Sequence, residues 1–200
     1  MKFLKIGKMT VEKKIYLIRH GETEWTRAGR HTSHTDLPLT RRGEKEARMI
    51  RKEIKHIAFS YVFASSLERA QRTCFLAGLE NRMHVDDDLL EWDYGEYEGK
   101  TTEEIRESRP GWTIFTGDPP GGETRAQIRA RADRLLEKLE QLEGPIALFS
   151  SGHISRAIGA RWIEQEVEFG KHLVLSTASV SILGFEHHVK TLVAWNEVMV

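Results

Sequence analysis

The chain has 200 residues, of which 40% are hydrophobic and 30% charged, and its 30 basic and 30 acidic side chains cancel. We expect a soluble protein of one domain, and we expect neither nucleic acid nor a membrane as a partner, because no overall field attracts them. The single cysteine, Cys74, excludes an internal disulfide and favours a reducing compartment. With no apolar run long enough for a membrane span, a cytoplasmic location is the expectation.

The beginning of the chain differs in character from the rest. Residues 1–13 are rich in lysine and hold only scattered apolar side chains. They lack the continuous apolar run and the small-residue cleavage site of a secretory signal. We therefore expect an N-terminal extension over residues 1–13 and one domain over residues 14–200, with Met9 as an alternative to Met1 for the start of translation.

The first half of the chain alternates apolar β-rich runs with helical periodicity. An apolar run at 14–18 ends abruptly in polar residues, which is typical of a buried strand. Thr40 is a suitable N-cap for an amphipathic helix that extends to about residue 56. A strand at 61–64 and a helix to about residue 79 come next, and the segment 83–99 is expected to be irregular and acidic.

The second half of the chain has clear helix and strand signals. Either Thr101 or Thr102 is expected to cap a short helix that ends before Pro110. Amphipathic periodicity predicts a long helix from Thr124 to about residue 142. The remaining elements are predicted in this order: a strand at 146–149, a helix at 154–163, and strands at 179–185 and 191–195 joined by a turn at His187-His188.

The order of these elements predicts the fold. Strands that alternate with helices indicate a single α/β domain with a mainly parallel central sheet and helices on both of its faces. In such sheets ligands bind beyond the carboxyl ends of the strands. Three predicted strands end in Arg19-His20, Ser65-Ser66 and Gly152-His153. We therefore expect these polar residues to converge at one edge of the sheet.

One motif, Arg19-His20-Gly21-Glu22, comes directly after the first buried strand, and three polar residues elsewhere complete a set with it: Arg69, Glu91 and His153. The set resembles the histidine phosphatase superfamily, also called the phosphoglycerate mutase-like superfamily. The similarity runs from residue 15 to about residue 196. It rests on these segments: Arg19-His20-Gly21-Glu22-Thr23-Glu24-Trp25, Leu37-Pro38-Leu39-Thr40 with Gly43, Ser65-Ser66-Leu67-Glu68-Arg69-Ala70, Leu90-Glu91-Trp92-Asp93-Tyr94-Gly95-Glu96-Tyr97-Glu98-Gly99, Gly121-Gly122-Glu123-Thr124, and Ser151-Gly152-His153.

The resemblance implies a role for each of these side chains. Neutral His20 is the nucleophile that takes the phosphoryl group. Arg19 and Arg69 hold the phosphoryl oxygens, and His153 is a further donor. Glu91 protonates the leaving alcohol and later deprotonates the attacking water. Several neighbouring carboxylates leave the identity of the proton donor open: Asp86, Asp87, Asp88, Asp93 and Glu96.

Further residues are candidates for substrate contact. Thr26 stands where many relatives carry an asparagine that touches the phosphate, and its hydroxyl can donate a similar bond. The loop that holds His31, Thr32 and Ser33 borders the substrate pocket in relatives, so these three residues are predicted to bind substrate. Larger aromatic side chains, including Tyr94, are interpreted as packing residues, and Cys74 as part of the core.

Three activities are compatible with the resemblance. Details of the motifs are similar to the sedoheptulose-1,7-bisphosphatase branch, which implies a phosphatase that acts on sugar phosphates without a metal ion or another cofactor. A phosphoglycerate mutase is the alternative, but mutases usually carry a longer insertion than residues 101–123 provide. A non-catalytic phosphate-binding scaffold is disfavoured because all five predicted catalytic residues are present. A small phosphorylated metabolite is the expected partner, and homo-oligomer formation stays open.

Overall fold

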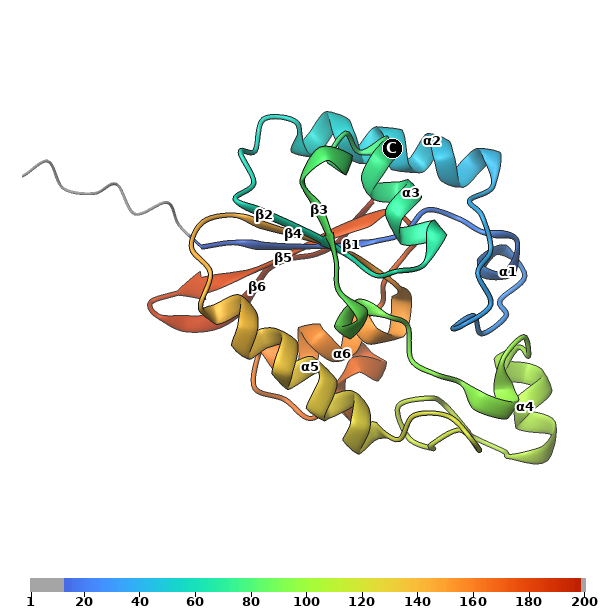
Figure 1. Cartoon of the computed structure of the whole chain (residues 1–200). Coiled ribbons are helices and arrows are strands. Elements are labelled where there is room, and N and C mark those ends of the chain that lie inside the picture. Colours follow the sequence, from blue (N-terminus) through green and yellow to red (C-terminus); the bar gives the residue numbers. More distant parts are fainter. Residues whose placement is uncertain (1–12, 199–200) are drawn as a thin grey trace, which may run out of the picture.

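A six-stranded sheet runs through residues 13–198, the part of the chain that this computed structural model describes (Figure 1). Its strands are β1 (Ile15–Arg19), β2 (Tyr61–Ala64), β3 (Met83–Val85), β4 (Ile146–Ser150), β5 (Ser179–Glu186) and β6 (Val189–Val198). They lie in the order β3-β2-β4-β1-β5-β6. The first four are parallel, whereas β5 is antiparallel to β1 and β6 to β5. The expected, mainly parallel α/β fold is confirmed.

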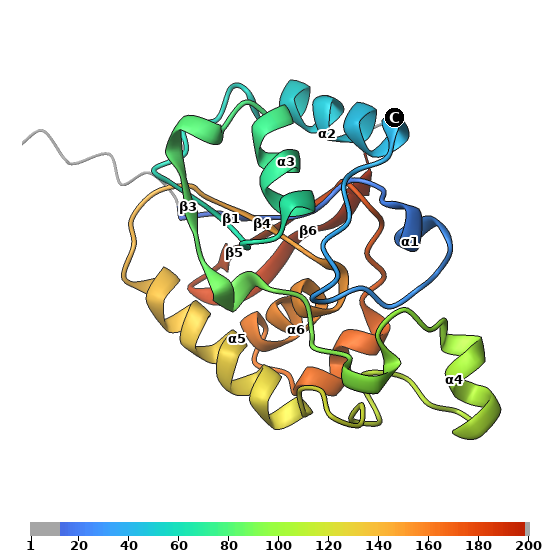
Figure 2. The ribbon, with the colours of Figure 1, turned by 45° about the vertical axis from the view of Figure 1, so that its right-hand side comes forward.

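Helices cover both faces of this sheet. They are α1 (Glu24–Arg27), α2 (Arg41–Ile54), α3 (Glu68–Leu76), α4 (Thr102–Ser108), α5 (Arg125–Glu140) and α6 (Gly152–Trp162), with short 3₁₀ turns at Glu80–Arg82, Asp87–Leu89, Gly95–Tyr97 and Val167–His172. Two views show α2 and α3 on one face and α5 and α6 on the other, with α4 beyond the end of the sheet (Figures 1 and 2). The predicted layers are therefore present.

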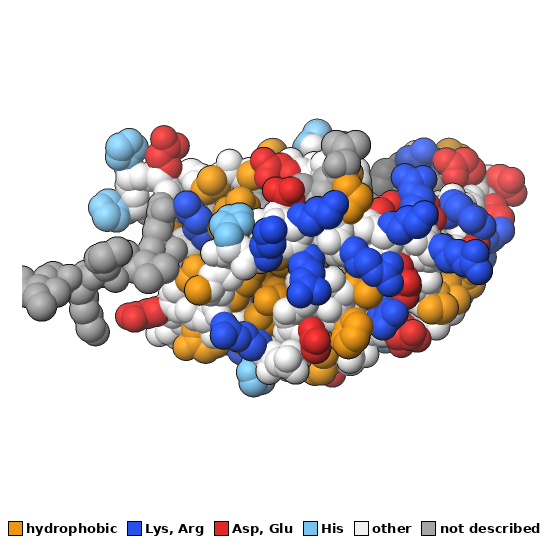
Figure 3. All heavy atoms as spheres, turned by 90° about the horizontal axis from the view of Figure 1, so that it is seen from above, with side chains coloured by type: hydrophobic (Ala, Val, Ile, Leu, Met, Phe, Trp, Pro, Cys, Tyr) orange, Lys and Arg blue, Asp and Glu red, His pale blue; other side chains and the backbone are white. Residues whose placement is uncertain are grey.

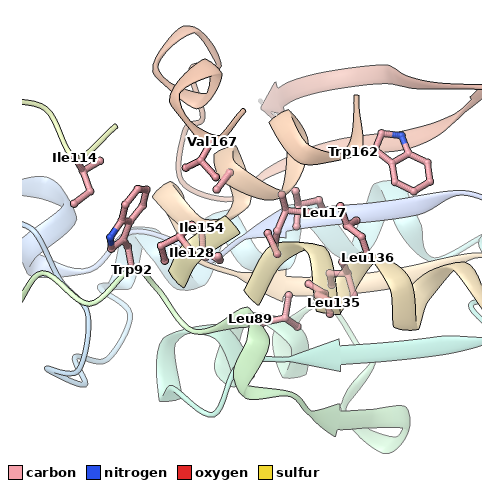
Figure 4. Packing of buried hydrophobic residues seen from close by; sticks show 14 of the residues in the cluster. Leu17, Leu89, Trp92, Ile114, Ile128, Leu135, Leu136, Ile154, Trp162 and Val167 are labelled. Atoms are coloured by element: carbon pink, nitrogen blue, oxygen red, sulfur yellow. The ribbon is translucent and has the colours of Figure 1, made fainter. Parts of the chain in front are cut away.

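Two apolar clusters fill the space between the sheet and its helices. Below the sheet, Leu17 of β1 packs with side chains of α5 and α6, among them Leu135 and Ile154 (Figure 4). Above the sheet, Ile18 of β1 packs in the cluster that holds Cys74 of α3. Neighbouring residues of β1 thus enter opposite clusters, because side chains alternate along a strand. Burial on both faces explains why the strands are continuous apolar runs.

Side-chain caps define the starts of three predicted helices. The Thr40 hydroxyl accepts a hydrogen bond of 3.0 Å from the backbone N–H of Gly43 at the start of α2. Thr101 and Thr124 form capping boxes at the starts of α4 and α5. At the other end of α3, Gly78 has a φ of +81°, a left-handed conformation that terminates helices. This glycine ends the helix earlier than the predicted residue 79.

The segment 83–99 differs from its prediction, because it contains β3 at the edge of the sheet. This strand has only three residues, of which His84 and Val85 are exposed, so no hydrophobic pattern marks it. The predicted turn between the last two strands is present. Its residues His187 and His188 have φ values of +49° and +67°, as a tight hairpin turn of this kind requires.

Basic side chains gather over α2 on the face that Figure 3 shows, with acidic side chains among them. Arg42 pairs with Glu46, and Arg48 with Glu44, one helical turn apart. These exposed pairs make α2 a solvated surface and contribute at most about 1 kcal/mol each.

The predicted N-terminal extension lies almost entirely outside the described residues, as does the choice between Met1 and Met9. The first described residue, Lys13, donates from Nζ to the Glu140 carbonyl over 2.6 Å. Within residues 13–198 no helix combines the length and the apolar character that crossing a membrane requires.

Candidate active site

A cavity of about 220 Å³ lies where β1 and β4 end. Most of its lining is polar, and the residues come from the end of β1, from α1 and the loop after it, from the segment that leads into α4, from the first turns of α6, and from the loop before β5. They are Arg19, His20, Thr26, Gly29, Arg30, His31, Thr32, Glu91, Tyr94, Thr102, Gly152, His153, Arg156 and Leu175. The site therefore lies beyond the carboxyl ends of parallel strands, as predicted for this type of sheet.

His20 comes directly after β1 and is 3% exposed. Its ring atom Nδ1 lies 2.8 Å from the Gly21 carbonyl oxygen, which can only accept, so Nδ1 carries the proton and Nε2 keeps its lone pair. Burial, together with the positive charges of Arg69 and Arg19, holds the pKa of His20 well below its ordinary value. The ring is therefore neutral and nucleophilic at physiological pH.

Arg19 is the last residue of β1 and lines the cavity. Nη1 donates to the Leu175 carbonyl over 2.6 Å, while the buried Nε has no partner among the described residues. Gly152 lies directly against this group, since a Cβ atom at position 152 would come within 3.2 Å of the Arg19 Cζ. The absence of a side chain at Gly152 therefore makes room for the guanidinium.

Arg69, in the first turn of α3, is fully buried next to His20 but does not line the cavity itself. The loop after α1 wraps around it, so that Nη2 donates to the carbonyls of Thr32 and Ser33 and Nη1 to the carbonyl of Thr35. Nε is left without a partner in residues 13–198. The predicted contact between Arg69 and phosphate stays a prediction. The positive charge of Arg69 lowers the pKa of His20 even without that contact.

Glu91 is held in one orientation by three backbone N–H groups. Oε1 accepts from Trp92 and Ile154 over 2.9 and 2.8 Å, and Oε2 accepts from His153 over 2.9 Å. The last two donors belong to the first turn of α6. None of the other carboxylates considered as proton donors lines the cavity: Asp86, Asp87, Asp88, Asp93 and Glu96. The geometry thus favours Glu91.

His153 lines the same cavity as His20, but its described contacts are with other groups. Nδ1 lies 2.5 Å from the Tyr94 hydroxyl, and the ring packs 5.7 Å from that of His31, centroid to centroid. Burial, with the positive charge of Arg156, holds the pKa of His153 well below its ordinary value. Burial also lowers the pKa of His31 to about 4. Both rings are therefore neutral, and the predicted role of His153 as a phosphate donor remains to be tested.

The other predicted substrate-binding residues separate into two groups. Thr26 and Thr32 line the cavity with His31, whereas Ser33 does not. The Thr26 hydroxyl bonds within the α1 cap, where it donates to the Thr23 carbonyl over 3.0 Å, so its expected bond to phosphate needs a change of partner. Ser33 is buried, and its backbone binds Arg69 and Glu98. It positions Arg69 in this structure.

Tyr94 and Arg156 are among the lining residues that were not predicted from the sequence. Tyr94 was interpreted as a packing residue, and its ring is indeed buried, but its hydroxyl bonds His153 at the cavity wall. Arg156 lies over the Phe115 ring, 4.6 Å from Cζ to the centroid, with Nε bonded to the Gly170 carbonyl. Its spacing from His153, three residues along one helix, was the signal that could have revealed it, because such residues share a face.

The fold and the cavity together define an α/β protein that holds a neutral histidine, near two arginines and a fixed carboxyl group, beyond the carboxyl ends of its parallel strands. The family model of the histidine phosphatase superfamily (branch 1) matches residues 15–198. The chain belongs to the histidine phosphatase superfamily, so the resemblance seen in its motifs is confirmed.

Individual relatives are similar over most of the chain. An acid phosphatase of Mycobacterium tuberculosis is 40% identical over 183 residues, which span 90% of this chain and 90% of the relative. Sedoheptulose 1,7-bisphosphatase of Saccharomyces cerevisiae is 34% identical over 178 residues, spanning 73% of this chain and 66% of the relative. A solved structure of an open reading frame product of M. tuberculosis has a TM-score of 0.88 and 37% identity, and covers 94% of this chain and 99% of its own.

Proposed function

We propose that this chain hydrolyses phosphate monoesters of small metabolites, above all sugar phosphates, through a phosphohistidine at His20. The observation that carries the proposal is the His20 ring itself, which is held neutral between Arg19 and Arg69 with Nε2 free to react. The fixed carboxyl group of Glu91 lines the same cavity. A nucleophile, charge for the phosphoryl oxygens and a proton carrier are thus within one small site.

In the first half of the reaction the lone pair of His20 Nε2 attacks phosphorus. A P–N bond forms while the P–O bond to the alcohol breaks, and Glu91 gives its proton to the departing oxygen. The guanidinium groups of Arg19 and Arg69 stabilise the charge on the phosphoryl oxygens, and their unpartnered buried Nε atoms are donors available for this purpose. The proton stays on Nδ1, which donates a hydrogen bond to the Gly21 carbonyl and so fixes the ring.

In the second half Glu91, now a carboxylate, accepts a proton from water. The water oxygen attacks phosphorus, the P–N bond breaks, and inorganic phosphate leaves with His20 neutral again. Because the three N–H groups that bind Glu91 belong to the backbone, the carboxyl group keeps its position through both halves. One residue can therefore serve as acid and base in turn. No metal ion takes part in this scheme.

The substrate class is supported by the lining and by the relatives. Arg30 and Arg156 add positive charge to the cavity wall, and hydroxyl groups of Thr32 and Thr102 add donors for a polyol. The names of the similar proteins, an acid phosphatase and a sedoheptulose 1,7-bisphosphatase, point to phosphate monoesters and to sugar bisphosphates. We expect a sugar phosphate to enter with its reacting phosphate at His20.

The mutase alternative lacks support in residues 101–123. Arg106 donates to the Trp112 carbonyl, and Arg109 donates to the Tyr97 hydroxyl and the Asp118 carbonyl. Neither arginine lines the cavity, so neither is placed to grip a second anionic group of a phosphoglycerate. We therefore expect water, rather than a second sugar or glycerate hydroxyl, to take the phosphate from His20.

The test is a panel of phosphorylated metabolites assayed by released phosphate for the wild type and His20→Ala. His56→Ala, in which an exposed histidine is lost, is the control. We expect sugar phosphates to have the highest kcat/KM, His20→Ala to be inactive, and His56→Ala and an excess of EDTA to leave the rate unchanged. Rapid isomerisation of 3-phosphoglycerate with a bisphosphoglycerate primer, with little phosphate released, would establish the mutase instead. No turnover of any ester between about pH 5 and pH 8 would favour the scaffold.

We further propose that the protein works in the cytoplasm. The support is the lone cysteine, Cys74, which is a free buried thiol. Cell fractionation tests this, and recovery with secreted proteins would contradict it. The partner we propose is the small phosphorylated substrate. The mass of the protein in solution tests whether copies of the chain associate.

A further inference from the structure

The sheet register places an unpredicted residue next to the nucleophile. Arg19 at the end of β1 pairs with Ser150 at the end of β4, and the His20 N–H donates to the Ser150 carbonyl over 2.9 Å. His20 and Ser151 are therefore the next residues along two adjacent parallel strands. Ser151 still has extended backbone angles, with φ of −114° and ψ of 179°. The two residues are thus neighbours across the strands.

The alternation of side chains gives both residues the same direction. Ile18 and Phe149, two positions earlier on each strand, both belong to the apolar cluster above the sheet, beneath α2 and α3. His20 and Ser151 consequently project to that side as well. Arg69, in the first turn of α3, comes from above the same side and acts electrostatically on His20. Three polar side chains are therefore placed on the same side of the sheet at this end of β1 and β4.

The Ser151 hydroxyl has no structural task that the described residues show. Ser151 is the N-cap of α6, and a serine in that position normally accepts a hydrogen bond from the first turn of its helix. Glu91 takes the N–H groups of His153 and Ile154 instead. The Ser151 side chain makes no cap bond, and its Oγ is buried without a partner in residues 13–198.

Leaving a buried hydroxyl unpaired is unfavourable for the folded protein. Two more donors near His20 are buried without a hydrogen-bond partner in the described part of the chain, the Nε atoms of Arg19 and Arg69. Three unused donors around one histidine are what a site for a phosphoryl group requires, because each can bond an oxygen that arrives only with the substrate.

We propose that Ser151 is a catalytic residue whose hydroxyl donates a hydrogen bond to a non-bridging oxygen of the phosphoryl group during its transfer to and from His20. The proposal rests on the function proposed above. Ser151 forms no covalent bond and keeps its proton, so the bonds that form and break in the two halves of the reaction are those described above. His153, the donor that the sequence suggested, lies two residues further on and bonds Tyr94 through Nδ1.

The chain offers a matched control. Ser155 lies one turn further along α6, is fully buried, and also has an Oγ without a partner among residues 13–198. Neither serine is part of the cavity lining, but Ser151 follows the pair of Arg19 and Ser150 in the strand register and is thus next to His20, whereas Ser155 has no place in that register. Ser151→Ala and Ser155→Ala therefore remove the same atom from equally buried positions, one beside His20 in the strand register and one a helical turn further along α6.

The experiment measures hydrolysis of p-nitrophenyl phosphate, inhibition by orthovanadate, and Tm for the wild type, Ser151→Ala, Ser151→Thr and Ser155→Ala. Removing a donor that acts on transition-state charge lowers kcat by about a hundredfold. We expect this loss in Ser151→Ala, a similar weakening of vanadate inhibition, a Tm no lower than that of the wild type, and partial recovery in Ser151→Thr. Ser155→Ala should keep wild-type kinetics.

Each other result contradicts the proposal in a recognisable way. Wild-type kcat and vanadate inhibition in Ser151→Ala would show that the hydroxyl does not contact the phosphoryl group. A loss of activity with a Tm lowered by several degrees, unrelieved in Ser151→Thr, would assign Ser151 to the fold. If the wild type itself hydrolyses no phosphate ester, the proposed function fails, and this inference fails with it.

Discussion

Glu91→Gln is the substitution that most sharply tests the assignment of the proton carrier. The change keeps the size of the side chain but replaces one carboxylate oxygen with an NH₂ group. One amide oxygen can still accept the bonds from Trp92 and Ile154, which share Oε1. In the wild type the His153 N–H donates to Oε2, so in the variant the NH₂ group faces that N–H. Two donors meet, and one buried N–H loses its partner.

The effect on stability comes from that single lost bond. An unsatisfied buried N–H costs about 2 kcal/mol, and for a domain of this size each kcal/mol lowers Tm by roughly 2–4 °C. We therefore expect a Tm about 4–8 °C below that of the wild type, with the protein still folded. Glu96→Gln is the matched control because Glu96 is an exposed carboxylate of the same segment, and its Tm should stay unchanged.

The effect on catalysis depends on the leaving group. A sugar alkoxide needs a proton as it departs, so Glu91→Gln should lower kcat for sugar phosphates by about 10²–10⁴. Nitrophenolate leaves without a proton, so the first transfer to His20 should survive. The second step lacks its base, and the phosphoenzyme should accumulate. Rapid mixing of Glu91→Gln with p-nitrophenyl phosphate is therefore expected to give a burst of nitrophenolate and then slow turnover.

Several results would refute this role of Glu91. A Glu91→Gln variant that hydrolyses sugar phosphates at the wild-type rate would remove Glu91 from the chemistry. Equal losses for sugar and nitrophenyl esters, with no burst, would show that the substitution harms binding or folding rather than proton transfer. A large loss of activity in Glu96→Gln would indicate that another carboxylate of the acidic segment carries the proton.

Three further predictions concern other parts of the structure. Gly152→Ala pushes a methyl group against the Arg19 guanidinium, which must shift by a few tenths of an ångström. We expect kcat/KM to fall roughly tenfold while Tm stays unchanged. Unchanged kinetics would contradict the tight contact between Gly152 and Arg19. Folding lowers the pKa of His31 from 6.5 to about 4, so the unfolded chain binds the proton more readily and stability is lost as pH falls below 6.5. Urea unfolding at about pH 7.5 and pH 5.5 measures this loss as a drop in the free energy of unfolding, which should be smaller by about 1 kcal/mol in His31→Gln than in the wild type. An identical pH dependence in both proteins would refute the prediction. Burial raises the pKa of the Cys74 thiol to about 12, so iodoacetamide should alkylate it only after unfolding, and rapid labelling of the folded protein would be the contrary result.

The sequence was most informative where the local pattern and the tertiary structure agree. Buried parallel strands are apolar throughout, and β2 has the predicted bounds of Tyr61–Ala64. Threonine caps marked the starts of α2, α4 and α5 because the capping bond is made within four residues. The strand β3 was missed because pairing with β2, rather than its own sequence, makes it a strand.

The candidate site was predictable in its motifs and less so in its geometry. His20 and Glu91 could be named because each sits in a recognisable segment. Tyr94 was interpreted as packing, and the sequence does not reveal that its hydroxyl reaches His153 across 59 positions of the chain. Ser151 belongs to a recognisable motif, but its place beside His20 depends on the register of β1 and β4, which only the folded sheet defines.

His20 as the carrier of the phosphoryl group is the feature on which the proposed function depends most. The most direct measurement is to quench the enzyme during turnover of a ³²P-labelled phosphate ester and to locate the label by peptide mapping. We predict an acid-labile, alkali-stable label on the peptide that contains His20, absent in His20→Ala and strongest in Glu91→Gln with p-nitrophenyl phosphate. A label on a serine or on another histidine, or none on an enzyme that is turning over, would contradict this role of His20.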